Sequence, residues 1–192
     1  MEYVKTKIPG VTILQPRIIT DARGYFMETF RHSEFTEKIG IIDFVQDNES
    51  ASTYGVVRGL HFQDIPHSQS KLVRCVSGKV LDVAVDLRSD SPTFGQHVAV
   101  TLDSILGTQL FIPRGFAHGY SVLSDQAVFQ YKCDAYYHPE SEGGIDPFDP
   151  ALGIDWGIDP AHAIVSEKDS SRPRLADIIG SIDFSGNLYD RI

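Results

Sequence analysis

The stretch KLVRCVSGKVLDVAVDL, residues 71–87, decides the fold class of this chain. Polar and apolar side chains alternate along part of the segment 81–87, which is typical of a β-strand with one face in a core. Ser77 and Gly78 form a turn signal that separates this strand from another one over 71–77. We therefore expect two consecutive strands, one on each side of this turn.

The same β signal extends over most of the chain. Short runs rich in β-branched and aromatic residues alternate with Gly, Pro, Asp and Ser, and this spacing indicates a sandwich or jelly roll. A short helix is expected from His32, capped by Ser33 and ended by Gly40. From about Tyr137 the chain is rich in Pro, Asp and Gly, and we expect it to wrap around the barrel with short helices and turns. The expected strands are 11–19, 24–30, 42–47, 55–62, 71–77, 79–87, 97–103, 108–112, 119–124 and 127–136.

Length and charge limit the function classes. The chain has 192 residues, 42% of them hydrophobic and 22% charged, which suits one globular domain over 1–192. Its 26 acidic and 17 basic residues give a net charge of -9, so it should repel nucleic acid and anionic membranes. We find no signal-peptide core and no run approaching the ~20 apolar residues of a membrane span. We therefore expect a cytoplasmic protein that binds neither nucleic acid nor membrane.

Two histidine-containing segments resemble the motifs of the cupin superfamily. His61 lies in GVVRGLHFQ, residues 55–63, six positions after the glycine that opens the first motif. His118 lies in IPRGFAHG, residues 112–119, and completes the second motif. The resemblance implies an all-β, cupin-type jelly-roll β-barrel with short peripheral helices. The members of the second motif are Gly107, Pro113, Gly115 and His118.

The first motif departs from the metal-binding cupins at two ligand positions. Gln63 replaces a histidine, and Lys71 stands where a glutamate is usual. A metal ion needs three or four neutral or anionic ligands, and an ammonium has no lone pair to offer. We therefore expect no metal; Lys71 is instead suited to stabilise a negative oxygen during a reaction. Cys75 and Cys133 form no zinc-binding pattern and are expected as reduced, buried thiols.

Eight segments, from about residue 8 to residue 178, resemble the dTDP-4-dehydrorhamnose 3,5-epimerase family in order and spacing. Relatives that invert a single centre share most of these motifs, so the resemblance is more specific for the family than for one substrate. The segments are RGYFMETF (23–30), QDNES (46–50), GVVRGLHFQ (55–63), QSKLVR (69–74), DVAVDLR (82–88), GFAHG (115–119), QYK (130–132) and SEKD (166–169).

The resemblance implies proton-transfer chemistry without a cofactor. The family's substrate has a ketone at C4 of the sugar, which acidifies the hydrogens at C3 and C5. A base, an acid on the opposite face and a stabiliser of the enolate oxygen are sufficient. His61 matches the base, Asp169 its partner, Tyr131 the acid and Lys71 the stabiliser.

The resemblance also implies a substrate site and an assembly. The substrate is a dTDP-keto-sugar, the product is dTDP-4-dehydro-L-rhamnose, and the protein is a homodimer whose N-terminal strands cross to the partner. Cations are expected to hold the diphosphate, an aromatic residue to stack on the base, and His118 to help hold the sugar. The residues that match substrate-binding positions are Arg23, Phe26, Glu28, Gln46, Asn48, Arg58, Gln63, His118, Tyr137, Glu142 and Lys168.

Three alternatives stay open from the sequence. One is an epimerase that inverts only C3 or only C5 of a related dTDP-keto-sugar, with the same residues. The second is a metal-dependent cupin, and the third is a sugar-nucleotide binding module without activity. The family usually has an aromatic residue, often Trp, shortly before an Asp-Pro pair; here Pro147 holds that position and Phe148 follows it. This departure affects the expected packing near the rim of the pocket.

Overall fold

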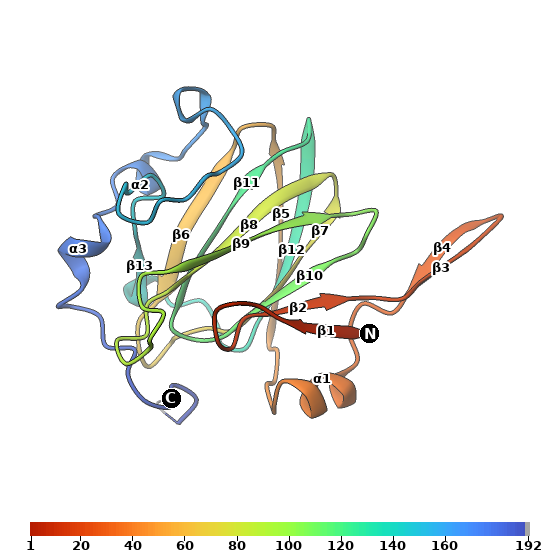
Figure 1. Ribbon diagram of the computed structural model, residues 1–192, viewed down its shortest axis with the longest axis horizontal. Coiled ribbons are helices and arrows are strands. Elements are labelled where there is room, and N and C mark those ends of the chain that lie inside the picture. The colour runs from red at the N-terminus through yellow and green to blue at the C-terminus, as the bar shows by residue number, and fades with distance from the viewer. Residues whose placement is uncertain (191–192) are drawn as a thin grey trace.

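Two antiparallel β-sheets face each other and contain most of the strands (Figure 1). The computed structural model describes residues 1–190. In spatial order, the larger sheet has six strands: β1 (Glu2–Lys5), β2 (Thr12–Gln15), β10 (Gln109–Ile112), β7 (Lys71–Ser77), β12 (Gln126–Cys133) and β5 (Gln46–Thr53). The smaller sheet has five: β13 (Glu142–Gly144), β6 (Val57–Gln63), β11 (Phe116–Val122), β8 (Lys79–Asp86) and β9 (His97–Asp103). The all-β, jelly-roll expectation is confirmed.

The main core lies between the two sheets, and strand β8 shows how the sequence builds it. Val80 and Ala84 point into this core, whereas Val83 and Val85 point to a second apolar cluster behind the smaller sheet. Successive side chains of a strand point to opposite faces, so β8 is apolar on both. Asp82 shares the inward face with Val80 and Ala84 and is fully buried.

Peripheral segments cover the outer face of each sheet. Helix α1 (His32–Lys38) packs Phe35 onto Leu14, Leu72 and Phe111 of the six-stranded sheet. The C-terminal segment covers the five-stranded sheet, and Trp156 is among the residues that it buries there. None of the helices within residues 1–190 is long and apolar enough to cross a membrane. The short helices of the C-terminal segment are η1 (Pro139–Ser141), η2 (Pro160–His162), α2 (Glu167–Ser170) and α3 (Leu175–Ile178).

A two-stranded hairpin projects away from both sheets. Its strands, β3 (Ile18–Asp21) and β4 (Gly24–Met27), pair only with each other and extend to the right in Figure 1. Tyr25 and Phe26 are 63% and 68% exposed, although aromatic side chains usually lose most of their contact with water on folding. The hairpin therefore presents apolar surface that this chain does not cover.

Three local expectations were wrong. The expected strand 11–19 is two strands, because Pro16 lies after β2 and has no N–H for the ladder. Ser33 lies inside the first turn of α1, and Arg31 occupies the N-cap without a side-chain hydrogen bond. Residues 42–45 form no strand, because Ile42 and Phe44 pack against α1 instead.

Candidate active site

A cavity of about 250 Å³ is lined by side chains from both sheets. Strands β5, β7 and β12 of the larger sheet form one wall, and β6 and β13 of the smaller sheet form the other. Eight of the residues singled out in the sequence meet here. The lining residues are Gln46, Asn48, His61, Phe62, Gln63, Gln69, Lys71, Tyr131, Cys133, Tyr137 and Glu142.

His61 and Asp169 form a hydrogen-bonded pair at the wall of this cavity. Nε2 of His61 lies 2.6 Å from Oδ1 of Asp169, and the backbone N–H of Gly59 donates to Oδ2 at 3.3 Å. Burial works to raise the pKa of the Asp169 carboxyl, but the hydrogen bonds from His61 and Gly59 outweigh it, and this pKa lies below its ordinary value. An ionised Asp169 accepts a hydrogen bond from Nε2–H, which leaves Nδ1 of the neutral ring as the basic atom.

Gly59 allows the strand that carries His61 to approach its neighbour closely. Its φ is +124°, and a Cβ placed there would lie 2.6 Å from Cα of Gly119. Strands β6 and β11 therefore pair at a distance that only glycine permits at this point. The pairing brings His61 directly opposite His118.

Lys71 and Tyr131 belong to neighbouring strands of the opposite sheet. Nζ of Lys71 lies 5.8 Å from the centre of the Tyr131 ring. Burial raises the pKa of Tyr131 to about 12, so its hydroxyl keeps its proton at neutral pH. Burial also lowers the pKa of the Lys71 ammonium, with Asp82 and Glu142 among the negative groups that oppose this. The cavity thus has a protonated hydroxyl and an amine on the wall that faces His61.

A second histidine–carboxylate pair lies deeper in the barrel. Nε2 of His118 is 2.8 Å from Oδ2 of Asp82, and both side chains are buried. Burial lowers the pKa of the His118 imidazole despite the nearby carboxylate. Oδ1 of Asp82 is buried and has no hydrogen-bond partner among the described residues. His118 does not line the cavity itself, so its expected contact with the sugar is not visible in this geometry.

Glu142 connects the cavity mouth to the C-terminal segment. Its carboxylate accepts hydrogen bonds from the Tyr137 hydroxyl, from Nζ of Lys168 at 2.7 Å and from Nη2 of Arg172 at 2.7 Å. Burial works to raise the pKa of Glu142, but the bonds from Lys168 and Tyr137 outweigh it and hold this pKa below its ordinary value. Glu142 is therefore a charged group at the rim with its hydrogen bonds already committed to protein partners.

The amide side chains of the cavity differ in what they hold. Gln63 donates to the carbonyl of His67 at 2.6 Å and accepts from the N–H of His138 at 2.6 Å, so it ties two loops together. Gln46 donates to Asn48 at 3.0 Å and accepts from the N–H of Tyr137 at 3.1 Å. Gln63 also donates to the carbonyl of Tyr136 at 3.2 Å, so the protein uses both of its N–H groups, and its oxygen keeps one lone pair for the predicted contact with substrate.

Four predicted substrate-binding residues lie away from this cavity. Arg23 and Phe26 are on the exposed hairpin, and Glu28 follows it and pairs with Arg31 at 2.9 Å. Arg58 is exposed on β6 and donates to Ser52 at 3.1 Å.

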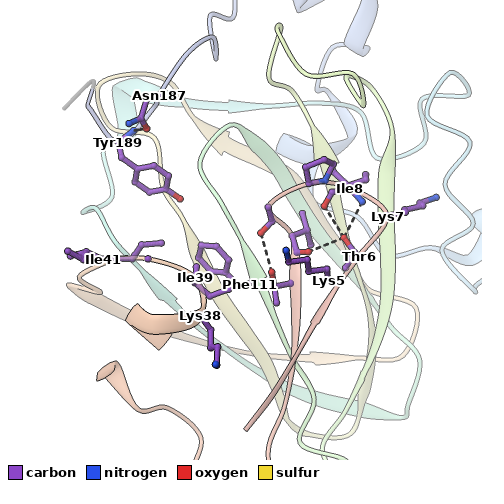
Figure 2. A pocket seen from close by; sticks show the side chains of 16 residues that line it. Lys5, Thr6, Lys7, Ile8, Lys38, Ile39, Ile41, Phe111, Asn187 and Tyr189 are labelled. Atoms are coloured by element: carbon purple, nitrogen blue, oxygen red, sulfur yellow. Dashed lines mark hydrogen bonds between the residues drawn. The ribbon is translucent and has the colours of Figure 1, made fainter. Parts of the chain in front are cut away.

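A larger hollow lies elsewhere (Figure 2). It has about 740 Å³ and is formed by the loop after β1, the end of α1 and the C-terminal segment. Lys5, Lys7, Lys38, Phe111 and Tyr189 are among its lining residues, and none of the predicted site residues is. Size alone therefore does not indicate where the chemistry lies.

The donor set of the small cavity does not suit a metal ion. His61 is hydrogen-bonded to Asp169, the Glu142 carboxylate is bound to two cations of the protein, and Lys71 adds an ammonium without a lone pair. No group of three His, Cys, Asp or Glu side chains within residues 1–190 is arranged to hold a metal ion.

The family described as dTDP-4-dehydrorhamnose 3,5-epimerase matches residues 5–177 of this chain. A dTDP-4-dehydrorhamnose 3,5-epimerase from Shigella flexneri is 48% identical over 178 residues, which cover 92% of this chain and 97% of the relative. The chain belongs to this family. The segments that resemble this family in the sequence thus reflect membership of it.

Solved structures agree with this membership. The dTDP-6-deoxy-D-glucose-3,5-epimerase of Legionella pneumophila Philadelphia 1, in complex with dTDP-4-keto-L-rhamnose, is 46% identical with a TM-score of 0.88. That similarity covers 95% of this chain and 94% of the other. ChmJ, a 3′-monoepimerase from Streptomyces bikiniensis in complex with dTDP-quinovose, is 34% identical with a TM-score of 0.89, over 97% of this chain and 95% of the other. Epimerases with one and with two target centres therefore share this fold.

Sequence reasoning missed several residues at or near the site. Asp82 had a signal, because it is a polar side chain on the inward face of an otherwise apolar strand. Cys133 also had one, since it follows Tyr131 by two positions and so shares its face of β12. Arg172 had none, because its contact with Glu142 exists only after folding.

The departure at Pro147 lies outside the cavity. The carbonyl of Pro147 accepts a hydrogen bond from the indole N–H of Trp156 at 2.7 Å, and Phe148 packs into the cluster behind the smaller sheet. Neither residue lines the cavity. Trp156 belongs to the same cluster, so the departure concerns the packing behind the smaller sheet.

Proposed function

We propose that this chain epimerises C3 and C5 of dTDP-4-dehydro-6-deoxy-D-glucose and yields dTDP-4-dehydro-L-rhamnose. The observation that carries the proposal is the placement of the His61–Asp169 pair and of Tyr131 on opposite walls of one cavity. Inversion of a carbon centre requires a proton to leave one face and another to arrive at the opposite face. A base on β6 and an acid on β12 meet this requirement.

Each proposed step uses a group of this chain. Nδ1 of neutral His61 takes the proton from the carbon beside the C4 ketone, and the C–H electron pair moves into an enolate. The ammonium of Lys71 stabilises the negative oxygen. Tyr131 then donates its proton to the opposite face of the same carbon. Because the reaction transfers no electrons to or from the substrate, it needs no redox cofactor.

The charge of Asp169 gives His61 its role as a base. In the resting state the carboxylate fixes the ring so that the basic nitrogen is free. When the ring gains the substrate proton, the adjacent negative charge stabilises the imidazolium. The lowered pKa of Asp169 keeps it ionised throughout this cycle at neutral pH.

We also propose a homodimer in which the hairpin β3–β4 of each chain completes the site of its partner. Arg23 and Phe26 match substrate-binding positions, yet they lie on a hairpin that its own chain leaves exposed. Strand β5 is an open edge of the larger sheet and lines the cavity, so a partner segment bound near it would reach the site. In this arrangement Arg23 holds the diphosphate, and Phe26 or Tyr137 stacks on the nucleotide base.

The proposal also includes the domain organisation, the cellular compartment and the remaining site residues. Residues 1–192 act as one domain, and the chain works in the cytoplasm, where the buried thiols Cys75 and Cys133 stay reduced. The side chains proposed to bind substrate are Arg23, Phe26, Glu28, Gln46, Asn48, Arg58, Gln63, His118, Tyr137, Glu142 and Lys168.

Product identification tests the function directly. The purified protein is incubated with dTDP-4-dehydro-6-deoxy-D-glucose, and the configuration at C3 and C5 of the product is read by NMR. Inversion at both carbons supports the proposal. The similarity to ChmJ favours inversion at C3 alone as the second candidate, and a product inverted only there would replace the proposed function.

A further inference from the structure

We propose that Arg172 is a positioning residue that holds Asp169 against His61 through Glu142. This inference rests on the proposed function, because it concerns the orientation of the proposed base. Arg172 lies outside the family motifs singled out in the sequence and does not line the cavity. Its effect on the reaction therefore has to pass through another residue.

The need for such a residue comes from the element that carries Asp169. Helix α2 has only four residues, and a single helical turn is not stable without contacts to the rest of the protein. The Ser166 hydroxyl caps this helix by accepting a hydrogen bond from the backbone N–H of Asp169 at 3.1 Å. This cap defines the turn itself but does not attach it to the strand that carries His61.

Asp169 itself bonds to Gly59 and His61 of that strand, and Glu142 adds an attachment on both sides of Asp169. Lys168 precedes Asp169 directly and Arg172 follows it by three positions, and both donate to the Glu142 carboxylate at 2.7 Å. Glu142 lies on β13, which pairs with β6 so that Gly144 is opposite His61. The carboxylate thus connects the segment 168–172 to the strand pair that carries His61.

The two cations differ in how firmly they are held. The Lys168 side chain is 60% exposed, whereas those of Arg172 and Glu142 are 14% and 13% exposed. Screening by solvent weakens the exposed contact, so the Arg172 ion pair is the stronger of the two attachments. Its loss should therefore affect the position of α2 more than the loss of Lys168 does.

Arg172 occupies a tight position in the fold that lowers the stability of the protein. A Cβ on Gly144 would lie 2.6 Å from Nε of Arg172, so a side chain at that position would displace the guanidinium. The same Nε is buried and has no hydrogen-bond partner among the described residues. A buried donor without a partner lowers stability, so packing alone does not account for an arginine here.

The ion pair also controls the charge near the proposed base. Glu142 interacts electrostatically with His61, and Arg172 neutralises part of its charge. Without Arg172, the less compensated Glu142 carboxylate attracts the positive charge of a protonated His61 ring more strongly. The base must be neutral, so the acid limb of the pH–rate profile then moves to higher pH. The other titratable groups around His61 are Asp169 on α2, His118 on β11, Lys71 on β7, and Tyr131 and Cys133 on β12.

Steady-state kinetics of three variants test the proposal. In R172M we expect kcat to fall on the order of tenfold to a hundredfold with KM nearly unchanged, because misplacement of a reacting group by about 1 Å costs roughly 10²-fold. R172K keeps the charge and should recover part of kcat and the wild-type pH profile. R174M is the matched control, because Arg174 is exposed and lies two residues further on; it should behave as wild type.

Two further measurements separate positioning from other roles. Hydrogen–deuterium exchange of the backbone over 166–173 should accelerate in R172M and not in R174M. In an E142Q background, R172M should cause little further loss of kcat, because the two residues act as one unit. A raised KM with unchanged kcat in R172M would overturn the proposal by making Arg172 a ligand of the substrate. An unchanged pH profile, with no rescue by R172K, would overturn it by making Arg172 a packing residue.

The outcomes also distinguish this inference from the proposed function. If wild type inverts the substrate and R172M equals wild type in kcat, the inference fails and the function stands. If wild type neither inverts the substrate nor exchanges its C3 and C5 hydrogens, the proposed function fails and the inference falls with it. Accelerated backbone exchange in R172M would then describe stability of α2 alone.

Discussion

At the scale of single residues, the proposed mechanism depends on a short contact between two side chains. The 2.6 Å separation of His61 and Asp169 selects one tautomer of the imidazole, and the buried carboxylate stabilises the charge that the ring gains. Both effects depend on ionisation of Asp169 rather than on its volume. An asparagine at position 169 has nearly the same shape and no charge, so it tests the effect of the charge alone.

We predict that Asp169→Asn lowers kcat by about 10²–10⁴-fold while the protein stays folded, since an asparagine in this position stabilises the wrong tautomer and no charge. Kinetics with the keto-sugar, together with circular dichroism, measure both parts. Asp159→Asn is the matched control, because Asp159 is an exposed carboxylate that also pairs with a histidine, His162, at 2.8 Å. Equal activity of the Asp169 variant and wild type would remove Asp169 from the proposed mechanism.

The pKa of Asp169 also predicts a dependence of stability on pH. A carboxyl whose pKa is lower in the folded state stabilises that state above its unfolded pKa, and this contribution is lost as pH falls through the folded pKa. The difference in unfolding free energy between wild type and Asp169→Asn should therefore shrink as pH falls below about 4. Urea unfolding at pH 7 and pH 3 measures it. A difference that grows toward pH 3 would contradict the assigned direction.

Tyr131 should separate proton removal from inversion. In Tyr131→Phe the base still removes and returns a proton on its own face, so exchange with solvent continues while inverted product falls by about 10²-fold or more. Mass spectrometry and NMR of the same sample in heavy water give both rates. Tyr136→Phe is the control, because Tyr136 is 65% exposed and does not line the cavity. Loss of exchange and inversion in equal measure would assign Tyr131 to another step.

At the scale of elements, strands were predictable where alternation or β-branched content was strong. The segment 71–87 forms β7, a turn and β8 as expected. The sequence could not predict the ends of elements that depend on distant contacts. Residues 42–45 read as a strand, yet Ile42 and Phe44 are used to cover α1. Strand β1 was missed because Glu2–Lys5 is a short and mostly exposed edge strand.

The site was predictable to the extent that its residues lie within motifs. His61, Lys71 and Tyr131 were identified from their segments, and the fold brings them to one cavity. The sequence does not tell where the hairpin residues lie, because their position relative to a site depends on a second chain. The ion pairs of Glu142 with Lys168 and Arg172 join residues that are 26 and 30 positions apart, so no local pattern could predict them.

The hairpin makes a prediction about pairs of chains. If β3–β4 completes the partner's site, His61→Ala and the double variant Arg23→Ala/Phe26→Ala are defective in different halves of it. After random mixing, about half of the dimers contain one chain of each kind and hence one intact site, which restores about a quarter of wild-type activity. Activity of unfolded and refolded mixtures measures this. A mixture no more active than the mean of its two parents would contradict the crossing of the hairpin.

At the scale of the whole molecule, the overall negative charge contrasts with the few positive side chains of the proposed diphosphate site. The net charge of -9 opposes binding of polyanions, while the proposed diphosphate contacts use only a few cations, Arg23, Arg58 and Lys168.

The dimer proposal predicts a mass in solution of twice the 21.3 kDa chain. Sedimentation equilibrium measures this mass, and a monomer that turns over substrate at full rate would show that no partner segment is needed.

In the proposed mechanism, His61 removes protons from both C3 and C5 within one cavity. We would follow dTDP-4-dehydro-6-deoxy-D-glucose in heavy water with wild type and His61→Ala, and read deuterium at each carbon by mass spectrometry and NMR. We expect deuterium at C3 and C5 with wild type and at neither carbon with His61→Ala. Label at one carbon only, or label at both carbons with His61→Ala, would contradict this mechanism.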